Sequence, residues 1–137
     1  MSQTMKKGGE IEMNKIRNNK AAFTLVEIMI VVAIIGLLAA LAIPGFVKAR
    51  KQSQGRRILN DARQLDAAID QWALETGQVD GATVNTTLAA SYLKTAWNSN
   101  DLLGNPFAIG AVGTNQVQIA TSTKTALAGV GIDWGPY

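Results

Sequence analysis

The stretch "NNKAAFTLVEIMIVVAIIGLLAALAIPGF" at residues 18–46 decides how this chain is organised. Residues 23–43 contain a single charged side chain, that of Glu27. At about 1.5 Å per residue, a helix over these residues covers the roughly 30 Å hydrocarbon core of a membrane. The stretch therefore predicts a helix that spans a membrane once.

Glu27 lies just inside the start of this apolar helix. A carboxylate in hydrocarbon costs about 2.5–3.5 kcal/mol even on lenient insertion scales. One interpretation is that a partner offsets this cost, which makes Glu27 a docking residue. The other is that Glu27 lies near the interface and favours the helix N-terminus electrostatically, by less than about 1 kcal/mol.

Composition and charge exclude several classes of function. The chain has 137 residues and a net charge of +3, but residues 1–22 carry five basic and two acidic side chains, so the remainder is neutral. The basic pI is therefore no sign of nucleic-acid binding. Cysteine and histidine are both missing from the sequence, which removes thiolate and imidazole chemistry. The sequence has no glycine-rich phosphate loop and no metal-spaced cluster, and we expect neither an enzyme nor a bound cofactor.

Helical periodicity continues beyond the apolar run. Pro44 predicts a kink or a stop. Apolar residues nevertheless recur every three or four positions after it: Ile58, Ala62, Leu65, Ile69 and Trp72. Gly77 is a natural C-terminal stop, so with a mild kink one helix covers residues 23–76 and its second half is amphipathic.

Residues 78–137 predict a small domain of different character. Thr86 and Thr87 precede "LAASYLKTA" and predict a short helix with a threonine cap. The stretches "PFAIGAV" and "QVQIA" predict two strands joined by a hairpin at residues 113–115. The final "VGIDWGPY" predicts an edge strand.

The predicted hairpin has one apolar face, because Val117 and Ile119 share one side and Gln116 and Gln118 the other. Such a sheet cannot bury this face alone and is expected to pack on the apolar seam of the helix. The predicted fold class is therefore α+β: a long N-terminal helix, transmembrane and then amphipathic, with a small antiparallel sheet packed on its distal half.

Two further groups of residues have structural interpretations. The tryptophans are expected in the core: Trp72, Trp97 and Trp134. The oxygen-rich "NSND" at residues 98–101 could contribute ligands to calcium, but a hard cation needs six to eight oxygens. No metal site is assigned there.

The stretch "KAAFTLVEIMIVVAIIGLLAALAIPGF" at residues 20–46 closely resembles the N-terminus of type IV pilins and type II secretion pseudopilins. It combines a basic leader, a small residue, and Phe-Thr-Leu-Val-Glu opening a membrane-length apolar run. The "LLGNPF" stretch also looks like the Gly-Asn-Pro-aromatic turn of pseudopilin C-terminal domains. The resemblance implies a pilin-like fold in four parts: a leader peptide at 1–22, a transmembrane assembly half of the helix at 23–44, an amphipathic half at 45–77, and a sheet domain at 78–137.

The resemblance also implies roles for individual residues. A prepilin peptidase would cut between Ala22 and Phe23 and would N-methylate Phe23. Glu27 would be the assembly glutamate, and Gly36 and Pro44 would weaken the helix between them so that it stretches or melts in the filament. Ala22 departs from the glycine that the family usually has before the cut. Met1, Met5 or Met13 could each begin the leader.

Elementary electrostatics accounts for a glutamate in this place. Cleavage would give Phe23 a charged α-amino group, and a neighbouring copy offset along a filament could bring that amine beside Glu27. Opposite charges about 4 Å apart attract by about 4 kcal/mol at an effective dielectric of 20, comparable with the cost of the carboxylate in lipid. Methylation preserves the positive charge.

These inferences predict a structural subunit of a type II secretion pseudopilus, because cleavage would leave a short mature chain that lacks cysteine. We expect one span of the bacterial inner membrane, a periplasmic C-terminal domain, and later a filament. Expected partners are further copies and other pilin-like subunits, the prepilin peptidase, the inner-membrane assembly platform and the lipid bilayer, without nucleic acid. The alternatives are a type IV pilus subunit, an exported domain cut after Ala42 by an ordinary signal peptidase, and an uncleaved membrane anchor.

The basic residues after the apolar run bear on orientation: Lys48, Arg50, Lys51, Arg56 and Arg57. A positive-inside count alone would place the C-terminal domain in the cytoplasm, opposite to the topology of the family, which we adopt. The cluster is interpreted as a solvated collar, with lipid headgroups or Asp61 and Asp66 of neighbouring subunits as other partners.

Overall fold

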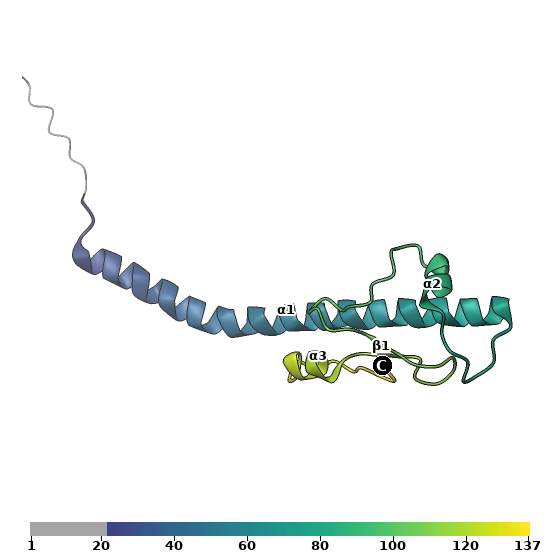
Figure 1. Cartoon of the computed structure of the whole chain (residues 1–137). Helices are drawn as coiled ribbons and strands as arrows, with labels where there is room; N and C mark the ends of the chain where they lie inside the picture. Colours follow the sequence, from purple (N-terminus) through teal and green to yellow (C-terminus); the bar gives the residue numbers. More distant parts are fainter. Residues whose placement is uncertain (1–21) are drawn as a thin grey trace, which may run out of the picture. The chain divides into compact units, whose positions relative to one another are not determined.

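The computed structural model describes residues 22–137, and the chain divides into two compact units between Leu37 and Leu38. The leader predicted from the sequence falls, up to residue 21, outside the described residues. Helix α1, Leu25–Thr76, takes part in both units (Figure 1). It continues through Pro44, so the proline does not end the helix.

The apolar seam of α1 forms one side of the core of the second unit, as predicted. All five of its members are buried: Ile58, Ala62, Leu65, Ile69 and Trp72. The C-terminal segment supplies the other side through Phe107, Val112, Val117, Ile119 and Leu127. Fully burying an aliphatic side chain is worth about 1.5–3 kcal/mol, so this seam is what holds the small domain to the helix. Trp97 and Trp134 are half-buried against the same core.

The end of α1 is fixed by Gly77, as predicted. This glycine has a φ of +65°, a left-handed conformation that side chains rarely adopt. The backbone N–H of Gln78 then donates to the carbonyl of Ala73 at 2.8 Å, the bond expected of a Schellman ending. The helix therefore stops because its last carbonyls are satisfied by the turn that follows.

The predicted hairpin is present but short. Strands β1, Ala108–Ile109, and β2, Val117–Gln118, pair antiparallel, with Ala108 opposite Gln118 and Ile109 opposite Val117. Isolated bridges join Thr83 to Ala111 and Asn100 to Pro106. Two-residue strands are not stable by themselves, so the sheet depends on its packing against α1.

Gln116 is not on the solvent face where strand alternation placed it. Its side chain is 2% exposed, whereas Gln118 is exposed. The Gln116 Nε2 donates to Asp70 Oδ1 at 2.6 Å and to the Asp66 carbonyl at 3.3 Å, and Oε1 accepts from the N–H of Gly113 at 3.1 Å. Gln116 precedes the paired part of β2, so the tight turn and its bonds to α1 determine its direction.

The short helix has a different cap from the predicted threonines. Helix α2, Thr86–Ala89, is followed by a 3-10 turn, η1, at Ala90–Tyr92. Asn85 is the cap, and its Oδ1 accepts from the N–H of Leu88 at 3.1 Å. Asparagine is the stronger N-cap and lies one residue earlier, so the prediction of a threonine cap was wrong. Leu93 is extended, and the predicted helix over residues 94–96 is not formed.

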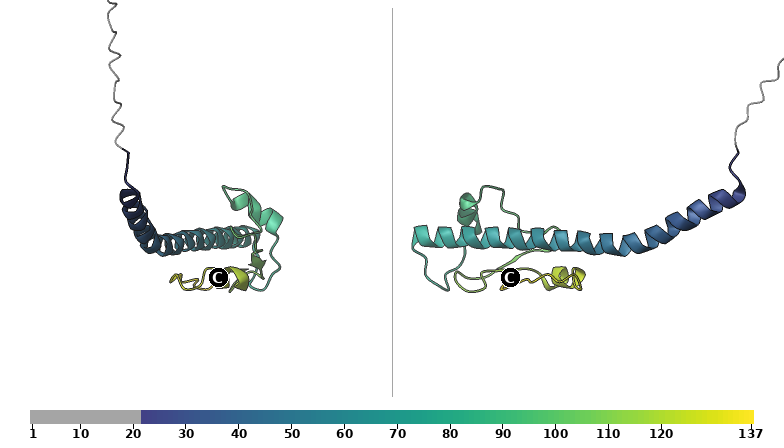
Figure 2. Two further views of the ribbon diagram at one scale, coloured as in Figure 1. Left: turned by 90° about the vertical axis from the view of Figure 1, so that its left-hand side faces the viewer. Right: turned by 180° about the vertical axis from the view of Figure 1, so that it is seen from behind.

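The last part of the chain also differs from its prediction. Helix α3, Thr121–Ala126, was not predicted, and residues 130–137 form no strand but run as a loop. Ile132 of this loop lies so close to α1 that a Cβ on the buried Gly55 would be 2.0 Å from its Cδ1. The loop therefore packs against a helix instead of pairing at a sheet edge. Figure 2 shows α2 and α3 on different sides of the C-terminal part of α1.

Candidate functional site

The start of α1 is held by a reciprocal pair of hydrogen bonds between Thr24 and Glu27. The backbone N–H of Thr24 donates to Glu27 Oε2 at 3.0 Å, and the backbone N–H of Glu27 donates to Thr24 Oγ1 at 3.2 Å. This is a capping box, which satisfies two of the backbone donors that every helix leaves free at its N-terminus. It explains why α1 begins at Leu25, two residues after the predicted start at Phe23.

The capping box adds a role for Glu27 that the sequence analysis did not assign. The signal was present as Thr-x-x-Glu at residues 24–27 directly before an apolar run. Within the described residues, Glu27 Oε1 accepts no hydrogen bond, and a carboxylate has about four lone-pair sites in all. Glu27 can therefore cap its own helix and still accept a cation from another molecule.

The predicted cleavage and methylation positions lie just before the helix. Ala22 and Phe23 have no regular secondary structure, and the Phe23 side chain is 79% exposed. An exposed backbone outside a helix is the kind of segment that a peptidase can bind.

Large apolar side chains surround the first part of α1 and remain exposed. They are Phe23, Leu25, Val26, Ile28, Met29, Ile30, Val31, Val32, Ile34, Ile35, Leu37, Leu38, Leu41, Ile43, Phe46 and Val47. Among the described helices, α1 alone is long and apolar enough to cross a membrane. A helix that is apolar on every side needs lipid or other helices around it.

Glu27 borders a shallow groove within this apolar surface. The groove is lined by Phe23, Ile28, Ile30 and Val31 together with Glu27. Among the residues that line this groove, Glu27 is the one with a charge, and the apolar surface beside it could receive the helix of another subunit.

The two residues predicted to weaken the helix both lie inside α1. A Cβ on Gly36 would meet no other atom within 4 Å, so packing in this chain does not require a glycine there. Pro44 has no N–H to donate to the carbonyl of Ala40, which removes one helical hydrogen bond. The segment between them is helical in this structure.

The oxygen-rich loop at residues 98–101 is organised around Asp101. Its Oδ1 accepts from the N–H groups of Leu103 at 2.9 Å and Asn105 at 3.0 Å, and its Oδ2 accepts from the Thr123 hydroxyl. The carboxylate is 7% exposed. It links the "LLGNPF" turn, in which Gly104 has a φ of +87°, to helix α3. In residues 22–137, no group of three or more carboxylate, histidine or cysteine side chains is placed to hold a metal ion.

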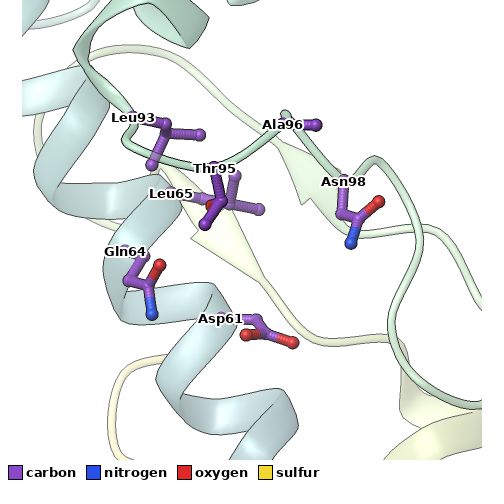
Figure 3. A pocket seen from close by; sticks show the side chains of 7 residues that line it. All are labelled: Asp61, Gln64, Leu65, Leu93, Thr95, Ala96 and Asn98. Atoms are coloured by element: carbon purple, nitrogen blue, oxygen red, sulfur yellow. The ribbon is translucent and has the colours of Figure 1, made fainter.

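A small cavity lies between α1 and the loop after η1 (Figure 3). Its volume is about 30 Å³, the room of one water molecule. The lining residues are Asp61, Gln64, Leu65, Leu93, Thr95, Ala96 and Asn98. The cavity is too small to hold a substrate or an organic cofactor.

Comparison with known proteins gives matches at the N-terminus and along the chain. Residues 17–43 match the family model of the prokaryotic N-terminal methylation motif. A type IV major fimbrial protein FimA of Dichelobacter nodosus is 32% identical over 119 residues, covering 87% of this chain and 65% of that protein. Fimbrial protein Q of Moraxella bovis is 32% identical over 122 residues, covering 82% and 76%.

Proteins of a secretion system match over a shorter stretch. The type II secretion system core protein G of Klebsiella michiganensis is 31% identical over 62 residues, covering 45% of this chain and 44% of that protein. This chain therefore spans about two thirds of the Dichelobacter protein and less than half of the Klebsiella protein. No solved structure shows a significant match.

Proposed function

This chain belongs to the family of type IV pilins and type II secretion pseudopilins, and we propose that it is a structural subunit of a type II secretion pseudopilus. We propose that it polymerises through the apolar part of α1. The observation that carries the proposal is the start of that helix, where a single acid with a free oxygen lies on an exposed apolar surface.

The proposed life of the subunit begins in the bacterial inner membrane. One span holds it there, with the C-terminal domain in the periplasm, until the prepilin peptidase cuts between Ala22 and Phe23 and methylates Phe23. The assembly platform then brings subunits together. In the filament, the Phe23 amine of one copy lies beside Glu27 of the next, and a pair about 4 Å apart contributes about 4 kcal/mol of attraction at an effective dielectric of 20.

The contact between copies is heterologous, because one end of the helix meets a different position on its neighbour. Heterologous contacts that do not close into rings give helical polymers. The role is therefore structural and not catalytic. The relatives agree in kind, since they are named as fimbrial proteins and as secretion system core proteins.

A type IV pilus subunit is the second candidate. In its favour, the fimbrial proteins of Dichelobacter and Moraxella align over 87% and 82% of this chain, against 45% for core protein G of Klebsiella. In favour of the pseudopilus, the Gly-Asn-Pro-aromatic turn is closed by the buried Asp101 and Thr123 and is a central part of the small domain. Deleting the gene separates the two: loss of protein secretion supports the pseudopilus, and loss of surface fimbriae supports the pilus.

The assembly role of Glu27 is tested by two substitutions that separate charge from capping. In Glu27→Gln the amide oxygen can still accept from the Thr24 N–H, but the negative charge is gone. In Glu27→Ala both are lost. We expect both variants to insert in the membrane at least as well as the wild type. We expect both to lower the yield of sedimentable filaments by at least about tenfold, the factor that corresponds to 1.4 kcal/mol of lost attraction.

The same two variants can also contradict an assembly role for the charge of Glu27. If Glu27→Gln forms filaments as well as the wild type and only Glu27→Ala fails, Glu27 acts through the cap and not through its charge. Wild-type yield from both variants would exclude any assembly role. Thr24→Ala is the matched control, because it removes the other half of the capping box and leaves the carboxylate.

A further inference from the structure

Charges along the second half of α1 are sorted by sign. The first group, here called the basic segment, contains Lys48, Arg50, Lys51, Arg56 and Arg57 and no acid between them. The second, here called the acidic segment, contains Asp61, Asp66, Asp70 and Glu75, with Arg63 the one basic residue among them. The net charges are therefore +5 and −3 within one helix.

Within residues 22–137, the charges of the two segments do not pair with each other. No ion pair joins any two residues of the part that the structure describes, residues 22–137. The acids accept hydrogen bonds from neutral groups instead. The Tyr137 hydroxyl donates to Asp66 at 3.1 Å, the Gln116 amide to Asp70 at 2.6 Å, and the Tyr92 hydroxyl to Glu75 at 2.6 Å. Neither segment is therefore paired with opposite charges within the described residues.

Both segments are accessible. Lys48, Arg50, Arg56 and Arg57 are exposed, and the two arginines at 56 and 57 border a surface groove that also contains Asn60. Asp70 and Glu75 are exposed in the acidic segment, and Asp61 and Asp66 are half-buried. A second molecule can therefore reach each segment without any rearrangement of the core.

The spacing between the segments defines a displacement. Their centres are about 16 residues apart, which is about 24 Å along a helix. We propose that the basic segment of one copy of this chain docks beside the acidic segment of a second, parallel copy displaced by about 24 Å along the helix axis. This inference rests on the proposed function, because it describes a second contact of the same filament.

The displacement is consistent with the contact at Glu27 and distinct from it. Placing the Phe23 amine of one copy at the level of Glu27 in another requires a shift of four residues, or about 6 Å, in the same direction. One helical polymer gives each subunit neighbours at several displacements. The two contacts therefore involve different neighbours, and neither competes with the other.

A second copy explains both segments, and a lipid surface explains only one. Anionic headgroups would attract the basic segment but would leave the acidic segment without a cation. The two segments are complementary in sign, so a copy of this chain supplies a partner for each. Exposed pairs contribute little singly, and their main effects are to set register and to speed association.

The test exchanges charges between two variants expressed in the native host. Arg56→Glu with Arg57→Glu puts two acids at the end of the basic segment and lowers its net charge from +5 to +1, and Asp70→Lys with Glu75→Lys changes the net charge of the acidic segment from −3 to +1. In a contact between two copies of the same variant, the substituted side chains lie opposite side chains of like charge. When the two are expressed together, each one offers the complement of the other, so copolymers regain opposite charges. We expect a yield of sedimentable filaments at least about tenfold lower for each alone, the ratio given by a change of 1.4 kcal/mol per contact, and a yield close to the wild type for the mixture.

Control variants and stability measurements distinguish a loss of charge from a loss of folding. Asp70→Asn with Glu75→Gln keeps oxygens that can accept from Gln116 and Tyr92 while removing the charges, and is expected to give an intermediate yield. Lys94→Glu makes the same kind of charge change at an exposed residue outside both segments, and is expected to behave as the wild type. Unfolding midpoints in detergent show whether each variant retains its core.

The proposal is overturned if either reversed variant forms filaments like the wild type. It is also overturned if both fail with intact cores and the mixture is not rescued. Failure of the arginine variant alone is the result expected when the basic segment binds lipid headgroups. Failure of the proposed function looks different. In that case the wild-type chain itself forms no filament, or Glu27→Ala forms filaments normally.

Discussion

Helix α1 carries apolar side chains along both of its halves but buries them in only one. The large apolar residues from Phe23 to Val47 are 46–79% exposed, whereas the seam from Ile58 to Trp72 is 0–3% exposed. The first set surrounds the helix and the second forms a single stripe. One continuous helix therefore meets two kinds of surroundings, its own small domain in the second half and lipid or other subunits in the first.

The two halves of α1 also differ in the side-chain hydrogen bonds that they make within the chain. Within the second half, hydrogen bonds from Gln116, Tyr137 and Tyr92 attach the C-terminal domain to α1. Within the first half, the only side-chain hydrogen bonds of the described residues are those of the capping box. Under the proposed function, lipid and other subunits supply the contacts of the first half.

The largest expected effect on stability comes from replacing isoleucine by alanine in the second half of α1, with the same replacement in the first half as the comparison. Ile69→Ala should lower the free energy of unfolding by about 2–5 kcal/mol, because Ile69 is 0% exposed and its removal leaves a cavity. Ile35→Ala, at a side chain that is 61% exposed, should leave unfolding of the C-terminal domain unchanged. Urea unfolding of the full chain in detergent, followed by tryptophan fluorescence, measures both. Equal losses would contradict the division of α1 into two environments.

A smaller effect is expected from a pair of glycines. In Gly55→Ala the new methyl group would be 2.0 Å from Ile132 Cδ1, so the isoleucine must move, at a cost of about 1–3 kcal/mol before the helix-propensity gain is counted. In Gly36→Ala nothing lies within 4 Å, and the helix gains about 1 kcal/mol from alanine.

Thermal unfolding in detergent distinguishes the two glycine variants. The midpoint of the C-terminal domain should be lower for Gly55→Ala than for Gly36→Ala, and Gly36→Ala should not lower it below the wild type. Destabilisation by Gly36→Ala would mean that the first half of α1 has a packing partner in the monomer.

The smallest effect concerns Glu75 at the end of the second half. The hydrogen bond from the Tyr92 hydroxyl, helped by Gln71, lowers the pKa of Glu75 below its ordinary 4.5. A carboxyl group whose pKa is lowered by folding stabilises the folded state at pH values above its pKa in the unfolded chain. This contribution is lost as the pH falls through the pKa of the folded state. Tyr92→Phe should raise the pKa of Glu75 towards 4.5, as measured by carboxyl NMR titration. An unchanged pKa would show that the Tyr92 bond does not act on Glu75.

Much of the fold could be predicted because its determinants are local and periodic. The period of three and four residues fixed the buried seam, Gly77 fixed the end of α1, and the positions of β1 and β2 followed from two short apolar runs. Family membership could be predicted from residues 20–46, where a basic leader, a small residue, Phe-Thr-Leu-Val-Glu and a long apolar run follow one another directly.

The features that the sequence did not predict depend on tertiary contacts or on which of several polar residues caps a helix. Helix α3 is a six-residue segment with only Ala126 as an apolar member, and Thr123 is its one buried side chain. Gln116 is turned towards α1 by bonds to residues about fifty positions earlier. The capping box and the Asn85 cap were local signals that the prediction passed over. The roles of Ala22, Phe23, Gly36 and Pro44 stay predictions, because they concern processing and assembly and not the fold of one chain.

The central claim is that Phe23 becomes a free, charged N-terminus that can meet the Glu27 of a neighbouring copy. Mass spectrometry of the N-terminal peptide, from chain purified out of native membranes and filaments, tests it most directly. We predict a peptide that begins at Phe23 and carries one additional methyl group. A chain that retains Ala22, or one that begins at Ile43, would contradict the account.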